Sequence, residues 1–421
     1  MNKKFKCLSC SGNKYQLIYN FGNIPLVNSF NFNFKISNKK YPLAVVICKD
    51  CLVCQLSDIP PADILFSDYQ HFSSASKDNI DHINKFCKIL PLILKPNSKV
   101  LEVGCNDGTM LRILDSAGFE VVGIDPAKNM ASIAIHKRLN TIFQNFGKQS
   151  ITKLIKNRKT KKFDCVLGLN VFAHFSSVPE AFWTIYQILK NEGIIIFEVA
   201  YAFDTIFSGI YDTVYHEHVF NHTVIGLKNI LSAANLKIIG INKIATQGGS
   251  IRVFAVKDIC KKKYKIVNDQ YIKLLNYENK QLDCGKKMGG GKKGLFALRI
   301  KKKITESIKL IKLSTRKFIK KDEPCFLIGS PARGVVIVNT CLFNFYSNLI
   351  PIDDTKEKEN KYFPGINAKV KNWNFLKKNQ NIRKCILLSW NYRNTMISKL
   401  KENGFQGKML CFFPKIDLIK I

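Results

Sequence analysis

Four cysteines near the start of the chain form two pairs with the same short spacing. Cys7 and Cys10 make the first pair, and Cys48 and Cys51 make the second. Two thiolates separated by two residues can both reach one ion from a tight turn, and two such turns complete a tetrahedral set of sulfur ligands for Zn²⁺. Because four sulfurs leave no open position on the metal, the pattern predicts a structural zinc site. Plain buried thiols are the alternative interpretation.

A glycine-containing turn follows at residues 101–108, with the sequence Leu-Glu-Val-Gly-Cys-Asn-Asp-Gly. Its glycines allow close approach of the backbone to a ligand, and the helix that begins after it offers free N–H groups. The spacing differs from the dinucleotide pattern, and an acid ends the next strand, where it can accept hydrogen bonds from ribose hydroxyls. We therefore predict an S-adenosylmethionine site; a simple tight turn is the alternative. The predicted cofactor-binding residues are Glu102, Gly104, Asn106, Gly108, Asp125 and Asn170.

Two imidazoles, a carboxylate and a phenol lie within four consecutive residues, Tyr215, His216, Glu217 and His218. Histidine titrates near neutral pH and a neighbouring carboxylate can tune it, so this density of groups indicates proton transfer. The spacing differs from that of a helical zinc protease motif. In an extended segment the two histidines would share one side. A hydrogen-bonded polar cluster without catalytic function is the alternative.

Two further segments join glycines to an arginine. Residues 247–252 end in Arg252, and residues 329–334 contain Arg333. Backbone amides together with a guanidinium group suit phosphate recognition. Tight turns that carry a surface arginine are the alternative at both places.

The elements that must position these groups alternate between strands and helices from residue 99 onwards. Such alternation predicts a parallel, doubly wound α/β sheet that binds its cofactor at the carboxyl ends of the strands. The predicted strands are 99–103, 120–124, 164–169, 193–199, 237–241 and 250–256, and the predicted helices are 78–94, 110–117, 130–137, 179–189 and 227–234.

The regions on either side of this core have different patterns. The N-terminal region reads as a small, loop-rich lobe with one short strand at 43–47, which a metal would organise. A lysine-rich helical region interrupted by glycines at 289–291 precedes a second, smaller α/β unit with strands at 324–328, 349–352 and 385–389. The predicted domains are a zinc-binding lobe at 1–75, a Rossmann-like S-adenosylmethionine-dependent methyltransferase core at 76–259, a connecting region at 260–321 and a Rossmann-like C-terminal domain at 322–421.

Composition limits the class of protein. The chain has 421 residues, enough for two or three domains, and a formal net charge of +35 that comes mostly from lysine. We interpret this charge as solvated faces, although residues 286–321 could contact a polyanion. No apolar run approaches membrane-spanning length, and the first residues lack the apolar core of a signal peptide. With reduced thiols, a cytoplasmic enzyme is the simplest expectation.

These segments together resemble one family, the sugar C-methyltransferases that act on nucleotide-linked 4-keto-deoxyhexoses. The similarity is collinear over essentially the whole chain and is most specific at residues 212–218, Asp-Thr-Val-Tyr-His-Glu-His. The other matching segments are residues 7–10, 25–30, 41–43, 48–51, 101–108, 197–201, 248–252, 329–334, 352–353, 363–365 and 389–391.

The resemblance implies methyl transfer from S-adenosylmethionine to C3 of a nucleotide-linked 4-keto-6-deoxyhexose, in branched deoxysugar synthesis. A carbon beside a ketone must lose a proton to form an enolate, which requires a base and a hydrogen-bond donor for the developing oxyanion. By this resemblance His218 is the base, Tyr215 is the oxyanion donor or a proton relay, and Glu217 orients the pair. Tyr69 matches a family tyrosine that enters from the N-terminal side, next to His71.

The resemblance also implies that the C-terminal domain binds the nucleotide and its diphosphate, near Arg333 and Lys358. Three places depart from the family pattern and leave the exact sugar open. Asn221 and His222 replace a usual aromatic pair, Asn360 stands where glycine is common, and residues 285–294 are atypical of a connecting helix. The predicted substrate-binding residues are His216, Arg252, Arg333, Lys358 and Tyr362.

Two other functions remain open at this point. A methyltransferase of the same architecture could act on another small molecule, and a basic zinc-containing protein could bind nucleic acid. The second alternative predicts strongly salt-sensitive binding to arbitrary nucleic acid without sugar turnover. We expect a nucleotide-sugar substrate, no nucleic-acid partner, no membrane association and a monomer.

Overall fold

The computed structural model describes most of the chain. The described residues are 5–61, 64–65, 72–74, 77–136, 139–155, 162–266, 268–283, 292–320, 322–342 and 347–421.

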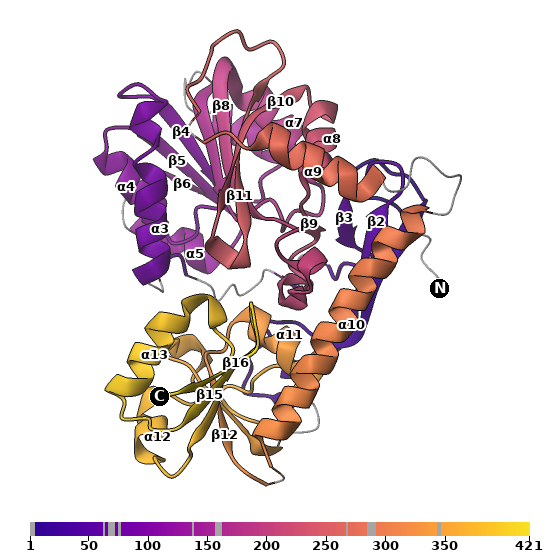
Figure 1. Cartoon of the computed structure of the whole chain (residues 1–421). Coiled ribbons are helices and arrows are strands. Elements are labelled where there is room, and N and C mark those ends of the chain that lie inside the picture. Colours follow the sequence, from indigo (N-terminus) through magenta and orange to yellow (C-terminus); the bar gives the residue numbers. More distant parts are fainter. Residues whose placement is uncertain are drawn as a thin grey trace.

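A seven-stranded sheet forms the centre of the molecule (Figure 1). The strands β4 to β8 run parallel to one another. The strands β10 and β11 add an antiparallel hairpin at one edge. The order β10-β11-β8-β7-β4-β5-β6 confirms the predicted Rossmann-like core and corrects the expectation of an all-parallel sheet. The strands are β4 (Lys99–Val103), β5 (Glu120–Asp125), β6 (Thr141–Phe143), β7 (Phe163–Leu169), β8 (Leu189–Ala200), β10 (Leu236–Ile244) and β11 (Ser250–Lys257).

Helices cover both faces of this sheet. Consecutive side chains of β8 point to opposite faces, so Ile194 and Ile196 join one apolar core while Ile195 and Phe197 join the other. This double burial explains why the strands read as nearly continuous apolar runs. One face carries α3 (Lys77–Cys87), α4 (Thr109–Ser116) and α5 (Lys128–His136), and the other carries α6 (Ile151–Ile155), α7 (Val178–Ile188) and α8 (Val224–Ala233).

The N-terminal lobe is more regular than the sequence predicts. It contains a four-stranded sheet of order β1-β2-β3-β9, in which β1 (Tyr15–Pro25) covers a region expected to be a loop. The fourth strand, β9 (Phe220–Asn221), comes from the middle of the chain and pairs with β3 (Cys54–Leu56). The backbone donors and acceptors of β3 are therefore satisfied by a segment that directly follows residues 212–218. The remaining elements of the lobe are α1 (Phe34–Ser37) and β2 (Lys40–Cys48).

Two helices connect the core to the C-terminal domain, α9 (Tyr271–Asp283) and α10 (Lys292–Phe318). Helix α10 runs diagonally from the N-terminal lobe to the C-terminal domain (Figure 1). Ile300, Ile304 and Ile311 recur at helical spacing and are buried, whereas the lysines at 301–303 are exposed. This division agrees with the interpretation of the lysines as a solvated face. The glycines at 289–291 lie outside the described residues.

The C-terminal domain is a second α/β unit with a five-stranded sheet of order β13-β12-β14-β15-β16. Its strands run parallel except β16, which is antiparallel to β15. This arrangement confirms the predicted smaller Rossmann-like unit. Its elements are β12 (Cys325–Ile328), α11 (Ala332–Cys341), β13 (Leu349–Ile352), α12 (Trp373–Lys378), β14 (Lys384–Leu387), α13 (Arg393–Glu402), β15 (Lys408–Cys411) and β16 (Asp417–Lys420).

Among the helices that the structure describes, none combines the length and the apolar character needed to cross a lipid bilayer.

Candidate active site

The glycine turn after β4 has the backbone conformation that a ligand cradle requires. Gly104 and Gly108 have φ angles of 71° and 76°, and Asn106 between them has a φ of 51°. A side-chain carbon on Gly104 would lie 2.7 Å from a methyl carbon of Val171, so no larger residue fits without a shift. The turn is fastened to the end of β5, because the Asn106 N–H donates to Asp125 Oδ2 at 2.9 Å.

The polar groups at this edge fit S-adenosylmethionine. Asp125 ends β5, and its carboxylate accepts two backbone N–H groups while keeping further acceptor capacity for hydroxyls. Glu102 Oε2 is buried and has no hydrogen-bond partner among the described residues. Burial, followed by the charges of Asp125 and Asp107, holds the pKa of Glu102 well above its usual value. Asn170, which directly follows β7 and has a φ of 55°, completes the predicted set at the carboxyl ends of three neighbouring strands.

The segment at residues 72–74 packs on this turn. The Ser73 N–H donates to Asn106 Oδ1 at 2.9 Å, and the Ser74 N–H donates to Asp107 Oδ2 at 3.2 Å. These bonds hold residues 73 and 74, which precede α3, against the glycine turn where the cofactor is expected to bind. Tyr69 and His71, predicted to reach the active site from this side, lie outside the described residues.

His218 and Tyr215 form a hydrogen-bonded pair. The Thr213 carbonyl lies 2.8 Å from His218 Nδ1, and a carbonyl can only accept, so Nδ1 carries the proton. In the neutral ring Nε2 is then the acceptor, and the Tyr215 hydroxyl donates to it at 2.6 Å. Residues 211–222 are all buried except His218, which is partly exposed. His218 is therefore the member of this segment that is open to a substrate.

Burial, and next the nearby imidazole of His174, lower the pKa of His218 well below its usual value. The imidazole is therefore neutral at physiological pH and able to accept a proton. The His174 ring lies 5.0 Å from the His218 ring. Sequence reasoning missed His174, although it stands four residues beyond Asn170 at the end of a core strand, where active-site residues of this fold gather.

Glu217 does not contact the pair that it was predicted to orient. Both of its carboxylate oxygens accept hydrogen bonds from Asn28 Nδ2, at 2.7 and 3.0 Å. The Thr213 carbonyl orients His218 instead. Adjacent side chains point in different directions here, so proximity in sequence was a poor guide. Burial raises the pKa of Glu217 to about 7, with the Asn28 amide acting in the opposite direction.

His216, which was predicted as a substrate-binding residue, also faces the N-terminal lobe. Its Nε2 lies 3.3 Å from the Tyr41 carbonyl and 3.2 Å from the Pro42 carbonyl, and the residue is 1% exposed. The two histidines therefore do not share one side, because the chain turns between them instead of extending. The role of His216 in this structure is to attach the segment to β2.

Arg252, which was predicted as a substrate-binding residue, contacts Glu198 inside the core. Its guanidinium contacts Glu198 Oε1 through Nε at 2.8 Å and through Nη2 at 2.6 Å, and it lies over the ring of Phe86. His82 Nε2 lies 2.6 Å from the other Glu198 oxygen. Glu198 is fully buried, so its charge requires these partners, and they tie α3 to β8 and β11.

The other predicted substrate-binding residues lie in the C-terminal domain. Arg333, which was predicted to lie near the diphosphate, is buried in an ion pair with Asp212. Lys358 Nζ donates to the Ser330 carbonyl at 2.9 Å, close to the N-terminus of α11. Tyr362 lies against the N-terminal lobe, where its backbone N–H donates to the Asn31 carbonyl.

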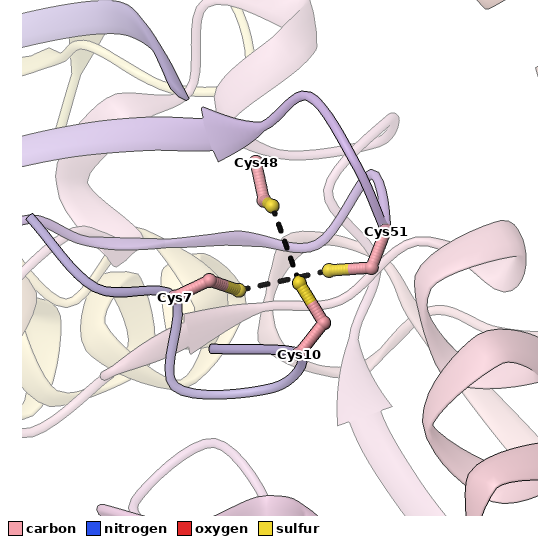
Figure 2. A group of neighbouring side chains, drawn as sticks. All are labelled: Cys7, Cys10, Cys48 and Cys51. Atoms are coloured by element: carbon pink, nitrogen blue, oxygen red, sulfur yellow. Dashed lines mark hydrogen bonds between the residues drawn. The ribbon is translucent and has the colours of Figure 1, made fainter. Parts of the chain in front are cut away.

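The four predicted metal ligands meet at the edge of the N-terminal lobe. The Sγ atoms of Cys7, Cys10, Cys48 and Cys51 all lie within 4.8 Å of one another (Figure 2). They come from two separate turns, one at the N-terminus and one between β2 and β3. Four sulfurs at such distances suit a tetrahedral Zn²⁺ site with no open coordination position.

Three family models match the chain in sequence order. Residues 7–66 match a zinc binding domain, residues 69–240 match a methyltransferase domain, and residues 245–414 match the C-methyltransferase C-terminal domain. The fold and the glycine turn thus belong to a methyltransferase.

Individual relatives differ in how much of the chain they cover. The C-methyltransferase NovU of Streptomyces niveus is 23% identical over 426 residues, which cover 98% of this chain and 96% of that protein. The ubiquinone biosynthesis O-methyltransferase of Pelagibacter ubique is 27% identical over 131 residues, which cover 31% of this chain and 52% of that protein. Among solved structures, the PH0226 protein of Pyrococcus horikoshii matches with a TM-score of 0.37 and 17% identity, covering 45% of this chain and 95% of that one.

The chain belongs to the S-adenosylmethionine-dependent C-methyltransferases that combine an N-terminal zinc-binding domain with a C-methyltransferase C-terminal domain. The predicted class of enzyme and its predicted cofactors, S-adenosylmethionine and zinc, are confirmed.

Removal of the metal should destabilise the lobe and the strand β9 that it carries. We expect about one zinc ion per chain in purified protein and its loss in Cys48→Ser, with a fall in stability of several kcal/mol because metal binding contributes directly to folding. Metal analysis and thermal unfolding with and without a chelator measure both effects. Cys54→Ala, which changes a buried thiol outside the quartet, is the control and should keep its zinc. Zinc-free protein of normal stability would contradict the assignment.

The buried carboxyl of Glu217 should make stability depend on pH. Its pKa rises from 4.5 to about 7 on folding, so the folded chain retains a proton that the unfolded chain releases between these values. The stabilisation is complete below about pH 4.5 and is lost as the pH rises through about 7, at up to ~1.4 kcal/mol per unit. We expect Glu217→Gln to flatten this slope in urea unfolding at about pH 5 and pH 7.5. Glu306→Gln, on the exposed face of α10, should leave the slope unchanged.

Proposed function

We propose that this enzyme transfers a methyl group to C3 of a nucleotide-linked 4-keto-6-deoxyhexose by way of an enolate. The observation that carries the proposal is the tautomer and exposure of His218. Its Nδ1–H is held by the Thr213 carbonyl, its Nε2 accepts from Tyr215, and it is the one residue of 211–222 that is not fully buried. A neutral imidazole with a fixed tautomer at an accessible position has the properties of a general base.

The hydrogen bond between Tyr215 and His218 favours the relay over a separate oxyanion role for the phenol. Because the hydroxyl already occupies Nε2 at 2.6 Å, a proton that leaves the sugar carbon reaches the imidazole through the phenol oxygen. The oxygen accepts the carbon-bound proton while its own proton passes to Nε2. The lone pair of the broken C–H bond then becomes part of the enolate. Burial of the pair keeps competing water away from these transfers.

Bound S-adenosylmethionine supplies an electrophilic methyl group. The residues that would hold it are those at the carboxyl ends of β4, β5 and β7, with Asp125 suited to the ribose and the start of α4 suited to polar groups near the turn. The first N–H groups of α4 have no partner within the helix and are available as donors to the cofactor. They lie beside the turn in which Gly104 leaves no room for a side chain.

The C-terminal domain has features that support nucleotide binding. The Ser330 hydroxyl is fully buried at the N-terminus of α11 and has no hydrogen-bond partner among the described residues. The cation of Lys358 lies beside it, and a side-chain carbon on Gly329 would overlap Ser389 Oγ. Helix N-terminal amides, a hydroxyl and an ammonium group suit a diphosphate. Arg333 is excluded from this role by its ion pair, so Lys358 is the cation we assign to the substrate.

Loss of the base should stop proton exchange and leave cofactor binding intact. In His218→Ala we expect solvent deuterium incorporation at C3 of the keto-sugar nucleotide to fall at least about a hundred-fold, as for removal of a general base. The binding of S-adenosylmethionine should stay unchanged, because His218 is not part of the turn after β4. Mass spectrometry of the recovered sugar and calorimetry of the cofactor provide the two measurements.

A matched control and a product assay separate the alternatives. His216→Gln keeps a donor for the Tyr41 and Pro42 carbonyls and should retain exchange. Unchanged exchange in His218→Ala would remove this residue as the base. A product methylated on oxygen or nitrogen would contradict the proposed reaction, and turnover confined to another small molecule would contradict the proposed substrate.

A further inference from the structure

The segment that carries the base begins with a buried junction to the C-terminal domain. Asp212 is fully buried, and its two carboxylate oxygens accept from two different residues of that domain. Arg333 Nη2 donates to Oδ1 at 2.8 Å, and Trp390 Nε1 donates to Oδ2 at 2.7 Å. The preceding residue is anchored in the same domain, since the Tyr211 hydroxyl lies 2.9 Å from Cys341 Sγ.

Thr213, whose carbonyl contacts the base, directly follows Asp212 in the chain. Tyr211, Asp212 and Thr213 form a single 3₁₀ turn, η5 (Tyr211–Thr213). The Thr213 carbonyl at the end of this turn is the acceptor for His218 Nδ1–H. The direction of that carbonyl depends on the orientation of the turn, and the turn is held by Asp212. A continuous series of hydrogen bonds therefore connects the C-terminal domain to His218. Arg333 and Trp390 hold Asp212, and the Thr213 carbonyl that follows Asp212 fixes the tautomer of His218.

The groups on the C-terminal side are themselves constrained. Arg333 Nη1 donates to the Gln247 carbonyl at 3.0 Å, and the guanidinium lies over the Trp390 ring at 4.8 Å. A side-chain carbon on Gly248 would lie 2.6 Å from that ring, so the indole packs directly on the backbone of the methyltransferase domain. Gln247 has a φ of 55°, a conformation that non-glycine residues rarely adopt. Trp390 and Arg333 thus meet the methyltransferase domain at two points, the catalytic segment and the turn before β11.

We propose that Arg333 and Trp390 are positioning residues for the catalytic base, acting through Asp212 and the Thr213 carbonyl. The C-terminal domain in this view does more than bind the nucleotide. Its docking against Asp212 sets the imidazole in the orientation that accepts the sugar proton. This inference rests on the proposed function, because the readout is proton abstraction from the substrate carbon.

The mildest test is Trp390→Phe, which removes the N–H donor to Asp212 and keeps an aromatic side chain at this position. We expect the C3 exchange rate and kcat to fall about ten-fold, the effect of one lost hydrogen bond, with KM for the sugar nucleotide changing less than about two-fold. S-adenosylmethionine affinity should match wild type and confirms that the variant is folded. Thr395→Val is the control. It removes a hydrogen bond from the C-terminal domain to Asp78 of α3, outside the chain of contacts to His218, and should leave exchange unchanged.

A second pair of variants tests the junction by the sign of a pH shift. The titratable and charged groups that face His218 are Tyr215, His174, His222 and Arg333, and the cation of Arg333 lowers the pKa of the imidazole. Arg333→Met removes that cation, so the rising limb of the pH–rate profile should move to higher pH. Asp212→Asn leaves the cation uncompensated, so the limb should move to lower pH. These shifts test the charge coupling between the junction and His218, and an unchanged limb in both variants would contradict that coupling and count against the positioning role.

Arg333→Lys keeps the charge but replaces the two guanidinium nitrogens that donate to Asp212 and to the Gln247 carbonyl with a single ammonium nitrogen. We expect it to keep the wild-type pH limb and to lose rate, which separates orientation from charge. Wild-type exchange rates in Trp390→Phe and Arg333→Lys would overturn the positioning role. Absence of exchange in wild-type enzyme would instead overturn the proposed function, and the two failures are therefore distinguishable.

Discussion

The buried carboxylate of Asp212 is the constraint on which the active site depends. A charge removed from water must be paired, and both partners of this one come from the C-terminal domain. Removal of either member of the Asp212–Arg333 pair would cost about 3–5 kcal/mol, because the other charge would remain buried and unpaired. The turn that ends at Thr213 is therefore held by the domain that contains Arg333, 121 residues beyond Asp212 in the chain.

The zinc-binding lobe holds the same segment from the other side. Glu217 accepts from Asn28, His216 contacts two carbonyls at the start of β2, and β9 completes the sheet of the lobe. These contacts bury the polar groups of the residues on either side of His218. His218 itself remains partly exposed. A metal far from the chemistry thus contributes to it, because the metal organises the sheet that β9 joins.

Much of the fold and part of the site could be predicted from local patterns. The strand at 99–103 and the strand at 349–352 were predicted at their observed bounds, since buried parallel strands are continuous apolar runs between turn residues. The region of β1 was misread as a loop, because its two register shifts against β2 disturb the alternation of apolar and polar residues. The antiparallel direction of β10 and β11 was also missed, since strand direction depends on connections and not on composition.

The sequence by itself determined which residues can do chemistry and where the cofactor turn lies, because glycine spacing, cysteine pairs and clustered histidines are local features. Only the tertiary structure decided what the charged side chains contact. Arg252 pairs with Glu198 and Arg333 pairs with Asp212, although both arginines stand beside glycines in a pattern typical of phosphate sites. The physical reason is that a buried charge takes the opposite charge that folding brings within reach, and that partner lies 54 residues away for Arg252 and 121 residues away for Arg333. No pattern of neighbouring residues records such a distance.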